Sequence, residues 1–275
     1  MSRQGQNAHA SELSRSGSRL RYWVAGPPDA PVVALTHGVS LDHRTFDGQV
    51  AALTDAGYRV LSWDIRGHGA SQPMGTDLEL SAVAADLIAI LDDVGAEQAV
   101  LVGQSFGGMV CQEALATAPD RVTGLVMIGT PALGDRPGPV MRVLQRLRIP
   151  LARLMPYGSL RRLFSTMVTK DPEVRRYVDE ATGQLPKPAF ISVSKAAMEG
   201  FLREEGAPTE AVPLLLVHGE VEEAMVARAL RAWASRDPSA RLEVIAGAGH
   251  LVNQERPEAF NAVLLDFLAS RAAVA

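Results

Sequence analysis

The chain of 275 residues has a single cysteine, Cys111, so no disulfide can form within it. It also lacks any run of about 18 apolar residues, the length that a membrane-spanning helix needs. Residues 1–19 are polar and contain no apolar segment like that of a secretion signal. These absences favour a cytoplasmic protein with no membrane partner, and they predict a disordered N-terminal tail over residues 1–19.

An excess of positive charge is missing as well. The chain has 27 Lys and Arg against 31 Asp and Glu, a formal net charge of −4. Without a basic field to attract phosphate, we expect no nucleic-acid partner. Hydrophobic residues make up 47% of the chain, which is enough for a large core. We therefore expect a globular monomer or homodimer whose partner is a small-molecule substrate.

Short apolar runs rich in Val, Leu and Ile predict strands that are covered on both faces. They occupy residues 20–25, 31–36, 59–63, 99–102, 124–128, 213–217 and 241–245. Segments with helical periodicity lie between them, at residues 80–94, 105–118, 222–235 and 257–269. This alternation predicts an α/β fold with a mostly parallel central sheet and helices on both faces.

Residues 131–212 interrupt the alternation, because they contain no convincing strand and several helix-like segments separated by prolines. We expect this stretch to be a helical lid inserted into a core made of residues 20–130 and 213–275. Apolar residues recur in it at helical spacing, and we expect most of them to pack the lid against the core while some wall the pocket. They are Met141, Leu144, Leu147, Leu151, Leu154, Met155, Leu160, Leu163, Phe164 and Met167. Of these, Met141, Leu144 and Phe164 are our candidates for contact with substrate.

The most informative motif is Gly103-Gln104-Ser105-Phe106-Gly107, which fits G-x-S-x-G. A predicted strand precedes it and a predicted helix follows. A serine on such a sharp turn has a strained backbone and presents its hydroxyl at the positive end of a helix. The alternative is a serine that only caps the helix. The flanking strand, helix and glycines favour a nucleophile.

Three further motifs agree with this one. They are Thr36-His37-Gly38-Val39, the turn from Trp63 to Gly69 (WDIRGHG), and Gly247-Ala248-Gly249-His250. In this order the four motifs resemble the α/β-hydrolase fold superfamily, in its serine-nucleophile esterase and lactonase branch, over residues 20–268. The stretch from His37 through the serine turn resembles 3-oxoadipate enol-lactonase and carboxylesterases.

The resemblance implies a role for each matched residue. Ser105 would be the nucleophile and His250 the general base, and the backbone amides of Val39 and Phe106 would form the oxyanion hole. No cofactor is implied. Haloalkane dehalogenases and epoxide hydrolases of this fold have an aspartate in place of Ser105, so the serine favours cleavage of an ester, lactone, thioester or C–C bond.

The acid of the triad departs from the usual pattern. The position where the family has aspartate holds Glu222, which has the correct order relative to Ser105 and His250. Glutamate can orient the imidazole as aspartate does. Glu220 and Glu223 share the loop, Asp135 follows an earlier strand, and an impaired site with no working acid is a further alternative.

The remaining histidines are interpreted as structural or solvated, except His43, which follows the oxyanion loop and either lines the pocket or is exposed. No histidine pair has metal-ligand spacing, so we expect no metal. The leading hypothesis is a hydrolase of a carboxylic ester or lactone of a mainly apolar small molecule. The alternatives are an acyltransferase, cyclase or C–C hydrolase with the same triad, or a non-catalytic ligand-binding member.

Overall fold

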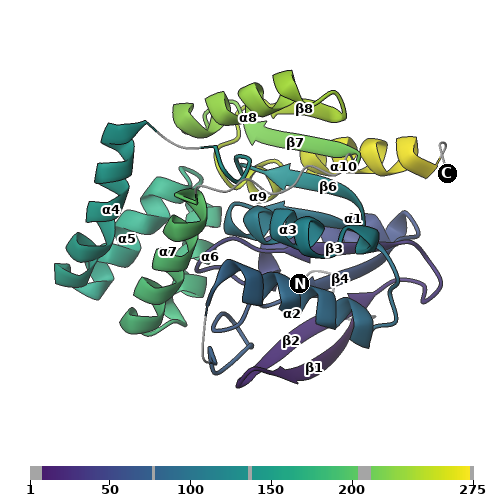
Figure 1. Ribbon diagram of the computed structural model, residues 1–275, viewed down its shortest axis with the longest axis horizontal. Coiled ribbons are helices and arrows are strands. Elements are labelled where there is room, and N and C mark those ends of the chain that lie inside the picture. The colour runs from purple at the N-terminus through teal and green to yellow at the C-terminus, as the bar shows by residue number, and fades with distance from the viewer. Residues whose placement is uncertain (1–7, 76–77, 136–137, 204–211, 273–275) are drawn as a thin grey trace.

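The computed structural model describes residues 8–75, 78–135, 138–203 and 212–272, except for the side chains of residues 140, 141, 146, 271 and 272. Within these residues eight strands form one sheet in the order β1-β2-β4-β3-β5-β6-β7-β8 (Figure 1). The six strands from β4 to β8 in this order are parallel, and β1 and β2 run antiparallel at one edge. The strands are β1 His9–Arg15, β2 Ser18–Ala25, β3 Val32–Thr36, β4 Arg59–Trp63, β5 Ala99–Gln104, β6 Val122–Ile128, β7 Leu214–Gly219 and β8 Ala240–Ile245. This sheet is the predicted α/β architecture.

The expected disordered tail is wrong for residues 9–19. They form β1 and the start of β2, paired in register from His9 opposite Val24 to Arg15 opposite Ser18. The two residues between the strands, Ser16 and Gly17, both have positive φ, at 47° and 75°. Positive φ at both central residues is the geometry of a tight hairpin turn. Residues 1–7 of the expected tail lie outside the described residues.

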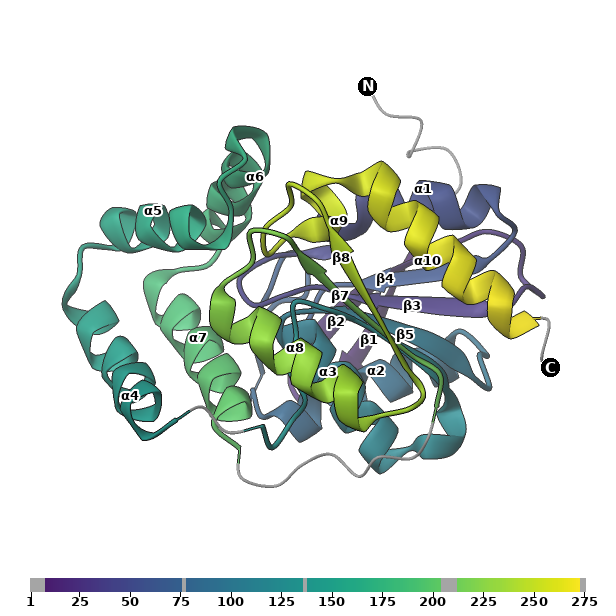
Figure 2. The ribbon, with the colours of Figure 1, turned by 90° about the horizontal axis from the view of Figure 1, so that it is seen from above.

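Helices cover both faces of the sheet because successive side chains of a strand point to opposite faces (Figure 2). In β5, Ala99 and Leu101 pack in the hydrophobic cluster that includes α2, α3 and α8, whereas Val100 and Val102 pack with α1, α9 and α10. The helices are α1 Asp47–Asp55, α2 Leu80–Asp93, α3 Phe106–Thr117, α8 Ala224–Arg236, α9 Val252–Glu255 and α10 Pro257–Ala272. The described residues also include two short 3₁₀ helices, His43–Phe46 and Pro119–Arg121.

Among its described residues, the segment between β6 and β7 contains helices joined by short irregular stretches and adds no strand to the sheet. It contains α4 Pro139–Leu154, α5 Tyr157–Val168, α6 Pro172–Gly183 and α7 Lys187–Phe201. These four helices gather at one end of the molecule, beyond the sheet (Figure 1). In the part of the chain that is described, every helix falls short of the length and apolar character that a bilayer crossing demands.

The expectation that most of the named apolar residues of this segment pack against the core is wrong for Leu144, Leu147 and Leu154, whereas Leu151, Leu163 and Met167 line a cavity, as expected for some of them. Ile149 and Leu160 are buried with Phe190 of α7. Six of the named residues are between 48% and 82% exposed: Leu144, Leu147, Leu151, Leu154, Leu163 and Met167. An amphipathic period identifies an apolar face but not what that face contacts, and here α4 is covered on one side only.

Candidate active site

Ser105 lies on the turn between β5 and α3, with the positive φ of 52° and a ψ of −117°. Positive φ is costly for a residue with a side chain and is kept only where the surroundings enforce it. The turn needs small neighbours, because a Cβ on Gly107 would lie 2.1 Å from the carbonyl oxygen of Thr36. The amide of Ser105 donates to the Ile128 carbonyl of β6, at 2.9 Å, which fixes the turn to the next strand. The serine therefore stands at the carboxyl end of the parallel strands.

His250 is in the loop after β8, and Glu222 is in the loop after the neighbouring strand β7. The imidazole Nδ1 of His250 and Oε2 of Glu222 are 2.9 Å apart. The other carboxylate oxygen of Glu222 accepts from the amide of Glu223, at 2.8 Å. The Glu222 side chain is 2% exposed, so both of its oxygens are held inside the loop.

This pairing determines the pKa of both groups. Burial alone would lower the pKa of His250, but the charge and hydrogen bond of Glu222 outweigh it, and the pKa is raised. Burial would raise the pKa of Glu222, but His250 and the Glu223 amide outweigh it, and the pKa is lowered. The pair therefore favours an ionised carboxylate beside the imidazole.

The other candidate acids do not contact His250. Glu220 accepts a hydrogen bond from the amide of Gly247, at 2.9 Å, and Glu223 is the residue that precedes α8. Asp135 forms an ion pair with Arg236, at 2.7 Å. Of the four acids that sequence left open, Glu222 is the one whose side chain reaches His250.

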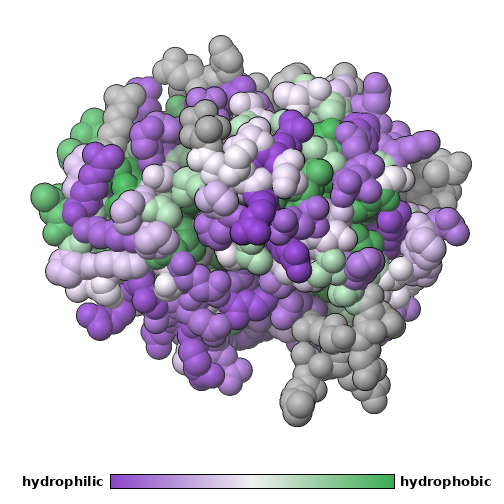
Figure 3. All heavy atoms as spheres, turned by 90° about the horizontal axis from the view of Figure 1, so that it is seen from below, coloured by the Kyte–Doolittle hydropathy of each residue, from purple (hydrophilic) through white to green (hydrophobic). Residues whose placement is uncertain are grey.

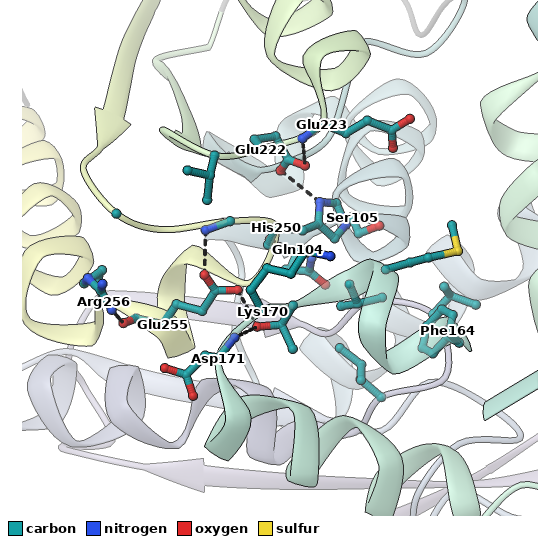
Figure 4. Close-up of a pocket in the computed structure, with 18 of the residues that line it drawn as sticks. Gln104, Ser105, Phe164, Lys170, Asp171, Glu222, Glu223, His250, Glu255 and Arg256 are labelled. Atoms are coloured by element: carbon teal, nitrogen blue, oxygen red, sulfur yellow. Dashed lines mark hydrogen bonds and ion pairs between the residues drawn. The ribbon is translucent and has the colours of Figure 1, made fainter. Parts of the chain in front are cut away.

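Ser105 and His250 line the same two cavities and lie next to each other in Figure 4. Among the described residues no hydrogen bond joins the Ser105 hydroxyl to His250, and such bonds often tighten only when substrate is present. The cavities have volumes of about 460 and 420 Å³. They share Val39, Ser105, Arg148, Phe164, Met167 and His250 in their walls.

The loop carrying Val39 is held by two buried histidines. His37 Nε2 accepts from the amide of Ile65, at 2.9 Å, and His68 Nε2 accepts from the amide of Ser40, at 3.0 Å. Burial lowers the pKa of both, that of His68 to about 3, so both rings stay neutral and can accept. They are structural, as expected for them.

Among the described residues, two backbone amides near Ser105 have no acceptor. Val39 lines both cavities, and its amide makes no hydrogen bond within the described part of the chain. Phe106 is the first residue of α3, where an amide has no partner inside the helix. These two amides can donate to a negative oxygen in the cavity.

The residues expected to contact substrate do not all lie at the cavities. Phe164 lines both cavities. Leu144 is 52% exposed and lines neither, so that expectation is wrong, and the side chain of Met141 lies outside the described residues. Of the two positions expected for His43, the one in the pocket is wrong, because His43 lines neither cavity. Its ring stacks on Trp23 at 3.6 Å and its Nδ1 is 2.9 Å from Asp64.

Sequence reasoning missed two residues that fix the loop of His250. The side-chain amide of Gln104 donates to the His250 carbonyl, at 3.3 Å. Glu255 accepts from the Gly249 amide, at 2.5 Å, and from the Thr169 hydroxyl, at 2.7 Å. Gln104 had a signal, its place beside Ser105, whereas nothing in the sequence marks Glu255. The described residues contain no group of three or more His, Cys, Asp or Glu side chains that could hold a metal ion.

Comparisons with known proteins identify the family of the chain. The family model of the alpha/beta hydrolase family matches residues 32–263. The chain is 30% identical to epoxide hydrolase A of Mycobacterium tuberculosis, over 93% of this chain and 96% of that protein. Among solved structures, a hydrolase from Pseudomonas aeruginosa is 28% identical with a TM-score of 0.82, covering 94% of this chain and 98% of that one. The enol-lactonase from Burkholderia xenovorans is 26% identical with a TM-score of 0.81, covering 94% and 100%. The chain therefore belongs to the alpha/beta hydrolase family.

Proposed function

We propose that this protein is a serine hydrolase that cleaves a carboxylic ester or lactone of a mainly apolar small molecule. The observation that carries the proposal is the place of Ser105, on a strained turn in the same cavities as His250, whose Nδ1 is 2.9 Å from Glu222. Nucleophile, base and orienting acid thus come from loops after three strands of one sheet.

The chemistry follows from these positions. Ser105 attacks the ester carbonyl while His250 takes the hydroxyl proton on Nε2. The carboxylate of Glu222 accepts from Nδ1–H, keeps the proton on that nitrogen and stabilises the imidazolium. His250 then protonates the leaving alkoxide, and the acyl-enzyme remains on Ser105. Water activated by the same imidazole releases the acid.

The amides of Val39 and Phe106 form the oxyanion hole in this proposal. The negative oxygen of each tetrahedral intermediate lies between the oxyanion loop and the first turn of α3, where these donors are fixed in advance. One such donor is worth about 3 kcal/mol in transition-state stabilisation.

The similarity to an epoxide hydrolase suggests epoxide hydrolysis as a second candidate reaction, but a serine nucleophile disfavours it. A carboxylate that opens an epoxide forms an ester, and water can then attack the ester carbonyl. A serine that opens an epoxide would form an ether, which has no carbonyl for water to attack, so the enzyme would stop after one turnover. Attack by Ser105 is productive on an acyl carbon.

The substrate class rests on the cavity of about 420 Å³. Beyond the reacting residues it is walled mainly by apolar side chains from α3 and from the helical segment between β6 and β7. They include Met109, Ile149, Leu160, Phe190, Met198 and Phe201. We propose that this segment is the lid that selects an apolar acyl or ring group.

A panel of substrates tests the proposal. We expect hydrolysis of p-nitrophenyl butyrate and of an aliphatic lactone, and no turnover of styrene oxide. Ser105→Ala and His250→Ala each lower kcat by about 10³-fold or more, since triad members act as a unit. Turnover of the epoxide but of no ester, or full activity in Ser105→Ala, would contradict the proposal.

A further inference from the structure

An exposed apolar face lies on the outside of α4 and α5. We call it the leucine face, and it consists of Leu144, Leu147, Leu151 and Leu154 of α4 with Leu163 and Met167 of α5. Leu154 is 82% exposed. Isolated exposed leucines are ordinary, but six large exposed apolar side chains on two consecutive helices are a feature of interaction sites. Figure 3 shows hydrophobic side chains gathered at the end of the molecule that carries these helices.

The charge of this region is opposite to that of the chain as a whole. Residues 139–170 contain six arginines and one lysine and no aspartate or glutamate, in a chain with a net charge of −4. At 3.6 residues per turn, Arg142 and Arg153 lie to one side of the α4 leucines and Arg148 lies to the other. Within the described residues, none of these three arginines has a carboxylate partner.

The leucine face is continuous with the apolar cavity. Leu151, Leu163 and Met167 are exposed and also line the cavity that contains Ser105 and His250. An apolar molecule that reaches the leucine face can therefore enter this cavity along apolar side chains.

We propose that the leucine face docks onto an anionic lipid surface, with the flanking arginines contacting the headgroups. An apolar stripe bordered by cations is the pattern of helices that lie in a membrane interface. A second copy of the chain is a poorer occupant, because a symmetric contact would place the same seven cations of each copy opposite one another. This peripheral docking replaces the sequence-based expectation of no membrane partner, and it does not depend on which bond the active site cleaves.

Vesicle co-sedimentation of the full chain tests the docking. We expect binding to vesicles that contain phosphatidylglycerol, weaker binding to pure phosphatidylcholine, and loss of binding as NaCl is raised from 0.1 to 1 M, where the Debye length falls from about 10 to about 3 Å. Arg153→Glu with Arg162→Glu, the second being exposed on α5 next to Leu163, should lower the partition coefficient by at least about 25-fold, at about fivefold for each arginine. Leu147→Asp with Leu154→Asp should lower it by about tenfold or more.

Matched controls separate docking from other effects. Arg228→Glu with Arg231→Glu, exposed on α8, and Val244→Asp, exposed on β8, should leave binding unchanged. Leu147, Leu154, Arg153 and Arg162 line neither cavity, so hydrolysis of a soluble short ester should be the same in all variants.

Two results would overturn the proposal. One is equal binding, or no binding, to anionic and neutral vesicles. The other is a dimer in size-exclusion chromatography that Leu147→Asp with Leu154→Asp dissociates, without vesicle binding by the unmodified chain. Failure of the proposed hydrolysis with vesicle binding intact would leave the docking standing.

Discussion

Replacing Glu222 by glutamine is the most informative single perturbation of the site. Both carboxylate oxygens already accept hydrogen bonds, one from His250 Nδ1 at 2.9 Å and one from the Glu223 amide at 2.8 Å. Glutamine has one carbonyl oxygen and one amide nitrogen, so it can accept only one of the two donors. The variant keeps the size of the side chain and forces a choice between two orientations.

Each orientation has a calculable consequence. If the glutamine oxygen faces His250, the Glu223 amide loses its acceptor, at a cost of about 1–3 kcal/mol, and the imidazolium loses the charge that stabilises it. If the glutamine nitrogen faces His250, the proton moves to Nε2 and the ring cannot take a proton from Ser105. In a serine-protease triad, the corresponding change of carboxylate to amide lowers kcat by about 10⁴. We expect a loss of about 10²- to 10⁴-fold here, or about 3–5 kcal/mol.

The assay is hydrolysis of p-nitrophenyl butyrate, with thermal unfolding followed to confirm that each variant is folded. Glu223→Gln is the matched control, because its carboxylate is in the same loop and does not contact His250. We expect it to retain activity within a few-fold of the unmodified enzyme. Full activity in Glu222→Gln together with a large loss in Glu223→Gln would refute the assignment of the acid.

Four further predictions follow from particular residues. Because the pKa of His250 is raised, kcat/KM should fall with decreasing pH at a midpoint above the ordinary 6.5, and removal of the Glu222 charge should move this midpoint down; a midpoint unchanged by that variant would contradict the pairing. Gly107→Ala should cost about 3 kcal/mol or more in urea unfolding, because its Cβ meets backbone oxygen at 2.1 Å; unchanged stability would contradict the tight turn. Phe164→Ala should raise KM for apolar esters by about tenfold and Leu144→Ala should not, in steady-state kinetics; equal effects would contradict the cavity assignment. Burial raises the pKa of Cys111 to about 12, so N-ethylmaleimide should neither label nor inhibit the folded enzyme, as mass spectrometry can check.

The central strands were predictable because parallel strands are buried on both faces and so appear as uninterrupted apolar runs. The run predicted at 59–63 coincides with β4, and that predicted at 241–245 differs from β8 by one residue. The edge strand β1 was missed for the converse reason. Its segment, HASELSR, is polar because it pairs with β2 alone, and the Ser16-Gly17 turn was its one available signal.

The candidate site was predictable where a motif fixes the backbone. The strained turn of Ser105 requires glycines at set positions, so its place appears in the sequence. The acid was not predictable to one residue, because three glutamates share the loop and only its backbone path decides which of them reaches His250. The surroundings of His43 and Leu144 depend on how distant segments pack, and no local pattern encodes that.

The role of Ser105 as nucleophile is the claim on which the proposed chemistry depends. Its most direct test is peptide mapping by mass spectrometry after treatment of the folded protein with a fluorophosphonate. We predict one adduct, on the Ser105 hydroxyl, and none in Ser105→Ala. An unmodified Ser105 in the treated protein, or an adduct that persists in Ser105→Ala, would contradict it.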